Sequence, residues 1–304
     1  MRAGACRLAH RQATPAMASS AAAVADPATT HPALYPHGLT SLSAGTHPTC
    51  TAPAILARLT APVAGPLPAS GSAFVCPRAL AYSLDALPKR WDMVVAHASV
   101  GILLHHTGLD AVLVVRQFRP AVWECVRAEE AAAATSAAGV GGGSDASALG
   151  AAAPPPHPPP PPALSAGLTF ELCAGILDKP ALSARAVAAE EVAEECGFGV
   201  DPGALEEVAS FRTAIGISGA PHTIFYAAVT DDDRLPPGAG VGGGVGGEEA
   251  IETLALPWAG VAAFLADPAL ARSAGLMYAL AWLAARRGGA AARGGGGCEG
   301  GRGV

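Results

Sequence analysis

Four glutamates crowd into one short stretch of the chain, at positions 190, 191, 194 and 195. Spacings of three and four residues bring such side chains together on one side of an α-helix. Ser183 is suited to cap the start of this helix and Gly197 its end. Like charges four residues apart repel by roughly 0.2–0.5 kcal/mol per pair. The face therefore either points into water or holds a cation, and hard divalent cations such as Mg²⁺ take carboxylate oxygens as ligands.

The residues around this helix follow the order strand, glycine, loop and helix. The segment Gly175–Phe198 resembles the Nudix box, which reads Gly, five residues, Glu, seven residues, then Arg-Glu-U-x-Glu-Glu-x-Gly-U, where U is bulky and apolar. The second half of the box is matched by Glu191, Val192, Glu194, Glu195, Gly197 and Phe198. The first half departs from it: counted from Gly175 it is one residue longer, and it lacks the first Glu.

Glu190 stands where the box usually has an arginine that orients a metal-binding glutamate. A carboxylate at this position adds repulsion instead. Two interpretations remain open. Either a nearby cation, Arg185 or Lys179, neutralises the charge of Glu190, or the affinity for the metal is weakened.

Further stretches resemble the UDP-sugar diphosphatase branch of the Nudix hydrolases, which is related to the ADP-ribose pyrophosphatases. They cover residues 89–104, 112–122, 171–183 and 223–231. The resemblance implies an α/β fold, a Nudix-type α/β/α sandwich with a mixed sheet. It also implies a homodimer and the hydrolysis of a nucleoside diphosphate sugar, UDP-glucose in the first place, to a nucleoside monophosphate and a sugar 1-phosphate. Mg²⁺, or alternatively Mn²⁺, is the implied cofactor.

The box pattern assigns the metal ligands. Glu191 and Glu195 are expected to bind Mg²⁺ directly, and Glu194 to bind a second ion or hold its neighbours in place. The main-chain carbonyl of Ala174 is a further expected ligand. The alternative, a solvated acidic helix face, stays open on spacing alone.

The substrate-binding residues are assigned by the same resemblance. Arg119 is expected to grip a substrate phosphate, since a guanidinium matches paired phosphate oxygens; the alternative is an ordinary surface arginine. Glu171 either contacts substrate or is structural, and His222 either touches sugar or phosphate or is incidental. Glu249, with Glu248 as backup, is expected to be the base that activates water; the alternative is two solvated charges in a flexible loop.

Composition excludes several classes of protein. A net charge of −6 gives no basic footprint for nucleic acid. Seven scattered cysteines without a CxxC pair indicate thiols in a reducing compartment. No apolar run reaches the roughly 18–20 residues that cross a membrane.

The chain divides into three parts. Residues 1–75 are expected to be a disordered or targeting extension, so that the protein is cytoplasmic, or plastid or mitochondrial if this leader is a transit peptide. Residues 76–286 are expected to form the Nudix hydrolase domain, with low-complexity insertions at about 128–167 and 236–247, and residues 287–304 a disordered Gly-rich tail. Strands are expected at 81–84, 99–104, 112–115, 168–173, 208–211, 223–229 and 252–256, and later helices at 258–265 and 270–286.

Three other functions compete with a UDP-glucose diphosphatase. An ADP-ribose pyrophosphatase would use the same box, because the box handles the diphosphate and other loops choose base and sugar. Glu190 and the missing first Glu favour a catalytically weak nucleotide-sugar binding module. The low-complexity tracts favour an interaction protein.

Overall fold

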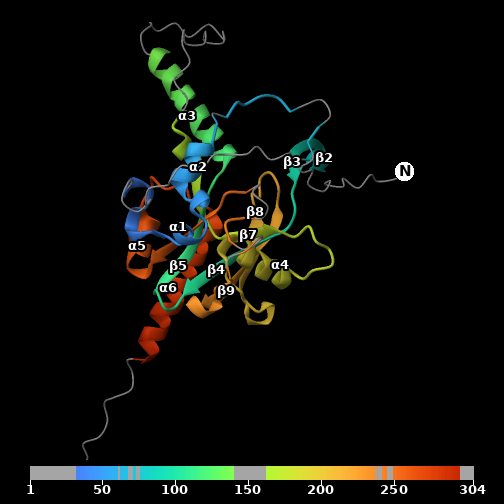
Figure 1. The fold of residues 1–304 in the computed structure, drawn as a ribbon. Helices are drawn as coiled ribbons and strands as arrows, with labels where there is room; N and C mark the ends of the chain where they lie inside the picture. The colour runs from blue at the N-terminus through green and yellow to red at the C-terminus, as the bar shows by residue number, and fades with distance from the viewer. Residues whose placement is uncertain are drawn as a thin grey trace, which may run out of the picture.

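The computed structural model describes residues 32–60, 62–67, 71–72, 76–139, 162–236, 238, 242–244 and 249–294. At the centre of this part lies an eight-stranded mixed sheet (Figure 1). Its order is β1-β10-β5-β4-β9-β8, with β6 paired to β5 and β7 to β4; β4 and β9 are parallel and the other pairs antiparallel. The strands are β1 (Thr40–Ser41), β4 (Ser99–His106), β5 (Ala111–Phe118), β6 (Leu168–Glu171), β7 (Cys173–Ile176), β8 (Glu206–Thr213), β9 (Ala220–Val229) and β10 (Glu252–Pro257).

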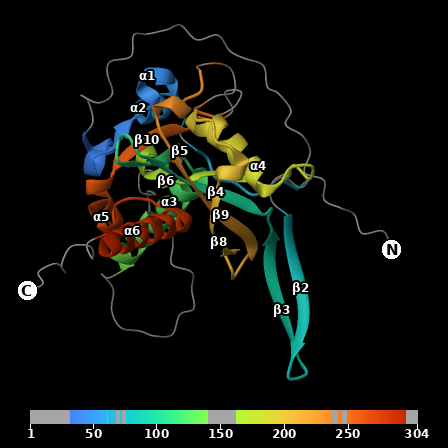
Figure 2. The same ribbon diagram turned by 90° about the horizontal axis from the view of Figure 1, so that it is seen from below.

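Both faces of this sheet are buried. In β5, Val112 and Val114 belong to one apolar layer and Leu113 and Val115 to the other, as the alternation of side chains along a strand requires. One layer is covered by α4 (Ala184–Glu191) and its π-helical continuation η6 (Val192–Cys196), the other by α5 (Trp258–Ala266) and α6 (Ala274–Gly294). Figure 2 shows α4 and α6 on opposite sides of the sheet. The predicted α/β/α sandwich with a mixed sheet is confirmed.

The sheet is forked between β4 and β5. The two strands pair with each other only at Leu104–His106 and Ala111–Leu113. Beyond that point β7 pairs with the start of β4, and β6 pairs with the end of β5. The predicted strand at 168–173 is therefore two strands, because the chain has to change partner at Leu172.

The N-terminal extension differs from its prediction. Residues 32–59 fold onto the edge of the sheet, where β1 pairs with β10 and where Leu39, Ala52 and Ile55 are buried. The short helices of this segment are η2 (Pro32–Leu34), η3 (Pro36–Gly38), α1 (Ser43–Thr46), η4 (Pro48–Cys50) and α2 (Ala52–Arg58). A few apolar side chains in an alanine- and proline-rich segment suffice to cover that edge. The Arg-containing leader of residues 1–31 lies outside the described residues.

A buried ion pair anchors this N-terminal segment. Arg116 of β5 and Glu252 of β10 are partners across the sheet, 1% and 0% exposed, with Nη2 and Oε2 2.5 Å apart. The N-terminal segment supplies the remaining hydrogen bonds. The Tyr35 hydroxyl and the Ala52 amide donate to Glu252 at 2.8 and 2.9 Å, and the Leu34 carbonyl accepts from Arg116. Burial, and then Glu252, raises the pKa of Tyr35 well above its usual value.

A two-stranded hairpin projects from the sandwich (Figure 2). It consists of β2 (Cys76–Leu84) and β3 (Leu87–Val95), so the predicted strand at 81–84 is the end of a longer one. The amide of Val94 donates to the carbonyl of Ile217 at 2.8 Å, which ties the hairpin to the loop between β8 and β9.

The two predicted insertions are partly ordered. Helix α3 (Pro120–Gly139) runs into the first, and η5 (Leu164–Gly167) closes it; residues 140–161 lie outside the described residues. In the second, Gly242–Gly244 pack against the box helix. Helix α6 also continues past the predicted end of the domain to Gly294. Within the described parts of the chain, no helix is both long and apolar enough to cross a membrane. Two short 3₁₀ turns complete the elements, η7 (Pro202–Ala204) and η8 (Asp231–Asp233).

Candidate active site

The box helix forms where the sequence predicted it. The Ser183 hydroxyl accepts a hydrogen bond from the amide of Ala186 at 3.2 Å, the expected N-cap, and Gly197 ends the helix with φ of 75°. The last turn, Val192–Cys196, is a π-helix, a form that often occurs at functional sites. Val187, Val192 and Phe198 enter the core and so turn the acidic face toward the fork in the sheet.

Glu191 and Glu195 turn inward from this helix. Glu195 is 5% exposed, and its Oε2 accepts a hydrogen bond from the amide of Ala174 on β7 at 3.0 Å. The carboxylate of Glu191 lies directly over Gly175, where a Cβ would collide with its Oε1. Any larger residue at position 175 would displace the Glu191 side chain, which is the physical reason for a glycine at the start of the box.

Burial raises the pKa of both carboxyl groups. It is the largest cause for Glu191, whose pKa rises to about 7, and Glu194 is the next. Burial is also the largest cause for Glu195, whose pKa rises to about 8 although the Ala174 amide acts to lower it. The charge of Glu249 raises both values further. In the metal-free protein both carboxyl groups therefore keep their protons at pH values where an ordinary glutamate is ionised, and neighbouring carboxylates add to this effect.

The carboxylates of Glu191 and Glu195 are chemically suited to bind a divalent cation. Oxygen ligands from several carboxylates are what Mg²⁺ and Mn²⁺ take, and a cation between Glu191 and Glu195 would relieve the cost of burying them as anions. In the described residues, no three acidic, histidine or cysteine side chains already converge on one point. The fit therefore rests on the kind, burial and charge of the donors.

Of the two candidates for the general base, the structure describes Glu249. Glu249 is exposed, and its backbone lies against Gly244, near enough to Glu191, Glu195 and Arg119 for its charge to act on all three. Glu248 lies outside the described residues. The structure thus places Glu249, the first candidate for the general base, near the carboxylates of the box.

Glu190, in the place of the usual arginine, has a cationic partner. Its Oε2 lies 2.6 Å from the Nζ of Lys179, which comes from the loop before the helix. Arg185, the other candidate, donates to the carbonyl of Leu205 and stacks over Phe225 instead. Lys179 also acts to lower the pKa of Glu191. Of the two candidates, Lys179 and not Arg185 is therefore the cation that pairs with Glu190.

Arg119 and Glu171 meet on the arm of the fork that β5 and β6 form. Arg119 directly follows β5 and Glu171 ends β6, and two parallel hydrogen bonds of 2.7 and 2.8 Å join Nε and Nη2 to the carboxylate. The Thr169 hydroxyl also donates to Glu171 at 2.5 Å. Burial acts to raise the pKa of Glu171, but these partners outweigh it and the pKa lies below its ordinary value. Glu171 therefore holds Arg119 in a fixed orientation.

His222 is not brought together with these residues. It lies near the start of β9 on the sheet face covered by α6, where its Nδ1 is 2.8 Å from the Ser99 hydroxyl and its ring covers Gly101. Burial lowers the pKa of His222, so the ring is neutral near pH 7. The box carboxylates lie on the opposite face.

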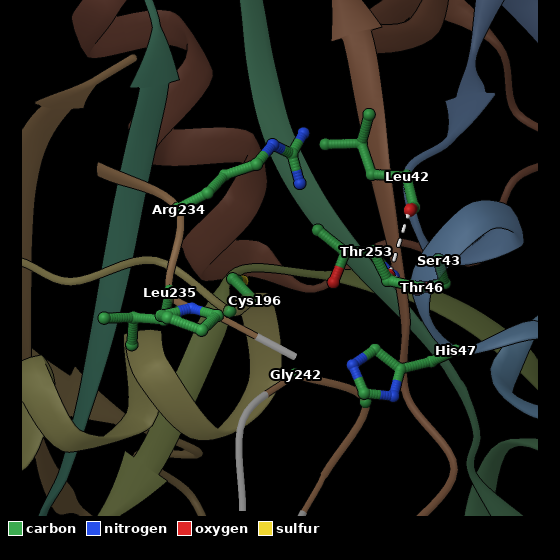
Figure 3. A pocket seen from close by; sticks show the side chains of 12 residues that line it. Leu42, Ser43, Thr46, His47, Cys196, Arg234, Leu235, Gly242 and Thr253 are labelled. Atoms are coloured by element: carbon green, nitrogen blue, oxygen red, sulfur yellow. Dashed lines mark hydrogen bonds between the residues drawn. The ribbon is translucent and has the colours of Figure 1, made fainter. Parts of the chain in front are cut away.

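A cavity of about 320 Å³ lies at the end of the box helix, and none of the box glutamates lines it (Figure 3). The helix end, the N-terminal segment and the second glycine-rich segment enclose it, through residues that include His47, Cys196, Gly242 and Thr253. Of the residues that line it, the sequence pointed to Gly197 as the end of the box helix but not to Thr253, since a buried threonine in a strand carries no functional signal.

The raised pKa values predict how metal binding depends on pH. Both carboxyl groups titrate above their ordinary value of 4.5 in the folded chain. Their contribution to stability is therefore present at low pH and is lost as the pH rises through about 7 to 8 in the metal-free protein. A bound cation competes with these protons, so its affinity should rise between pH 6 and 8 by up to about tenfold per pH unit for each proton displaced.

Thermal melts with and without Mg²⁺ at pH 6, 7, 8 and 9 check this. The rise in Tm caused by Mg²⁺ should grow across the series. An exposed carboxylate elsewhere is the control: Glu207→Gln should show the wild-type pH dependence. A Mg²⁺ effect that is equal at all four pH values would show that these carboxyls are not the ligands.

The relatives described next show that this chain, with its glycine-led box helix packed on a mixed sheet, belongs to the Nudix hydrolase family. It is 36% identical over 214 residues to the uridine diphosphate glucose pyrophosphatase NUDT14 of Bos taurus, covering 70% of this chain and 89% of that protein. The corresponding protein of Mus musculus is 34% identical over 212 residues, covering 69% and 88%.

A solved structure described as an ADP compounds hydrolase is similar with a TM-score of 0.44 and 13% identity, over 75% of this chain and 98% of that one. No protein-family profile matches the sequence.

Proposed function

We propose that the protein hydrolyses the diphosphate bond of a nucleoside diphosphate sugar in the presence of Mg²⁺, with UDP-glucose as the substrate and UMP and glucose 1-phosphate as products. The observation that carries this proposal is the pair of inward-turned carboxylates, Glu191 and Glu195, beside an oriented arginine. The UDP-glucose pyrophosphatases to which the chain is similar support the choice of substrate.

The metal would be held by the box. Glu191 and Glu195 are the proposed direct ligands, with Glu194 and the carbonyl of Ala174 completing the set. When bound, Mg²⁺ neutralises charge on the diphosphate oxygens and makes water more acidic. Mn²⁺ satisfies the same oxygen donors.

Arg119 is the proposed phosphate-binding residue. Glu171 occupies Nε and Nη2, while Nη1 makes no hydrogen bond within the described residues. The free end of a fixed guanidinium is suited to a phosphate oxygen, and because Glu171 already holds the side chain, little rotamer entropy is lost on binding. The role of Glu171 is therefore to orient Arg119.

Glu249 is the proposed general base. Its carboxylate takes a proton from the attacking water as the water oxygen bonds to one phosphorus and the bridging P–O bond breaks. The bridging oxygen leaves with the other phosphate. Glu248 stays the second candidate, and His222 has no part in this proposal because it lies on the other face of the sheet.

A substrate panel tests the function. Purified protein is incubated with millimolar Mg²⁺ and UDP-glucose, other nucleotide sugars or ADP-ribose, and the products are identified. UMP and glucose 1-phosphate, formed faster from UDP-glucose than AMP from ADP-ribose, are the expected result. Preference for ADP-ribose would establish the runner-up. Ligand-dependent stabilisation without any product would establish a binding module.

A homodimer is part of the proposal, and the hairpin supports it. One face of β2 and β3 carries six exposed apolar side chains, together with Arg78 and Lys89: Leu80, Tyr82, Leu84, Leu87, Trp91 and Val95. The opposite face carries Ala81, Arg90 and Asp92. A projecting hairpin that exposes this many apolar side chains is poorly stable alone in water, and a second copy of the chain would cover them.

A single charge on that face should separate the subunits. Leu80 is 54% exposed and paired with Trp91, so Leu80→Arg is expected to give a monomer in sedimentation equilibrium while the fold is kept. Ala81→Arg, on the opposite face of the same strand, should leave the dimer unchanged. Equal behaviour of the two variants would place the interface elsewhere.

A further inference from the structure

The end of the box helix is held by a short glycine segment far away in the sequence. The amides of Gly242, Gly243 and Gly244 donate to the carbonyls of Ala193, Glu195 and Glu194 at 2.9, 2.9 and 3.1 Å. Carbonyls at the C-terminus of a helix have no partners within the helix. This glycine triplet therefore satisfies the carbonyls of the turn that carries two of the proposed metal-binding glutamates.

The conformation of the triplet requires glycine. Its three φ angles are 72°, 75° and 91°, a region that side chains rarely adopt. A Cβ on the first two would approach the Nε2 of His47 and the Sγ of Cys50 to 2.8 and 2.9 Å, and one on the third would approach the Cβ of Glu249 to 2.9 Å. The triplet thus lies between the N-terminal segment and the proposed base.

Thr253 joins the same turn to the N-terminal segment. Its hydroxyl donates to the carbonyl of Glu195 at 3.1 Å, its amide donates to the hydroxyl of Ser43 at 2.9 Å, and its carbonyl accepts from the amide of Leu42 at 2.9 Å. Figure 3 shows Ser43 and Thr253 side by side at the edge of the cavity. Thr253 is 3% exposed, so these bonds are made out of contact with bulk water.

We infer that Thr253 and the triplet Gly242–Gly244 are positioning residues. They hold the backbone carbonyls of the last turn of the box helix and so fix where the Glu195 carboxylate lies. The carbonyl of Glu195 accepts two hydrogen bonds from this side, while its carboxylate is held from the other side by the amide of Ala174. A metal ligand fixed at both ends of its residue is preorganised. Loss of a hydrogen bond to the ligating group itself typically costs about 10- to 100-fold in metal affinity, and loss of a bond to the backbone of the ligand is expected at the lower end of that range. The inference rests on the proposed function, because it takes Glu195 as a metal ligand.

Thr253→Val tests the inference, because it removes only the hydroxyl at nearly constant volume. Mg²⁺ affinity measured by calorimetry without substrate should fall roughly tenfold, and kcat should fall while KM for UDP-glucose changes less than twofold. Thr253→Ser should restore both. Thr51→Val is the matched control, since Thr51 is equally buried and its hydroxyl donates to the carbonyl of Pro48 at 3.0 Å, outside the box.

A second variant acts on the triplet. Gly243→Ala should weaken Mg²⁺ binding, whereas Gly219→Ala, at a φ of 65° with open space around the added methyl, should lose stability only. Wild-type protein that binds Mg²⁺ and hydrolyses UDP-glucose, together with a Thr253→Val variant that behaves like Thr51→Val, overturns the positioning role alone. Wild-type protein that neither binds Mg²⁺ nor forms product overturns the proposed function, and the positioning role with it.

Discussion

Replacing Glu195 by glutamine is expected to lower kcat for UDP-glucose by about 10³-fold while the fold remains intact. The loss follows from removing a charged ligand of the metal that stabilises charge on the diphosphate, a contribution of several kcal/mol. Folding should not suffer, because burial already disfavours the ionised carboxyl and raises its pKa to about 8. The amide oxygen of glutamine can still accept the hydrogen bond from Ala174.

Steady-state kinetics and thermal melts measure the two parts of this prediction. Without Mg²⁺ the variant should melt at or above the wild-type temperature at pH 8, and Mg²⁺ should add little. Glu207→Gln, an exposed carboxylate on β8, should keep wild-type kcat. Full activity in Glu195→Gln would show that the metal ligands have been assigned to the wrong residues.

Replacing Arg116 by methionine is expected to lower the free energy of unfolding by about 3–5 kcal/mol, the cost of leaving a buried charge without its partner. Among the described residues, Glu252 would keep only the Tyr35 hydroxyl and the Ala52 amide as partners, and both belong to the N-terminal segment. That segment should therefore detach early in unfolding. Denaturant unfolding followed by fluorescence measures the change.

The ion pair between Arg286 and Glu206 is the matched control for Arg116. Its atoms are as close, at 2.6 Å, but both side chains are 46% exposed. Exposed pairs contribute about 0–1 kcal/mol, so Arg286→Met should cost far less than Arg116→Met. Equal losses in the two variants would mean that burial of the Arg116–Glu252 pair adds little to the free energy of unfolding. The pair would then not be what anchors the N-terminal segment.

The box helix could be predicted because its signals are local. Ser183, Gly197 and the spacing of the glutamates fix its start, its end and its acidic face without reference to the rest of the chain. The glycine before the helix was also in its expected place, although the reason, close contact with Glu191, becomes visible only in the structure. The central strands were predicted for a similar reason, since both faces are buried and the strands read as apolar runs.

Features made by residues distant in sequence could not be predicted. Thr253 and Ser43 are 210 positions apart, and neither belongs to a motif. The N-terminal segment has the composition of a leader, and its packing on the edge at β10 becomes visible only in the structure. Lys179 was one of two possible partners of Glu190, and the conformation of the loop decided between them.

The most direct test of the central claim is anomalous scattering from a crystal soaked with Mn²⁺ and a non-hydrolysable UDP-glucose analogue. A Mn²⁺ peak is expected at about 2.0–2.3 Å from carboxylate oxygens of Glu191 and Glu195, the usual range for such ions, with the diphosphate between the metal and Arg119. Mn²⁺ bound elsewhere, with both carboxylates turned away from it in a crystal whose protein is active, would contradict the account.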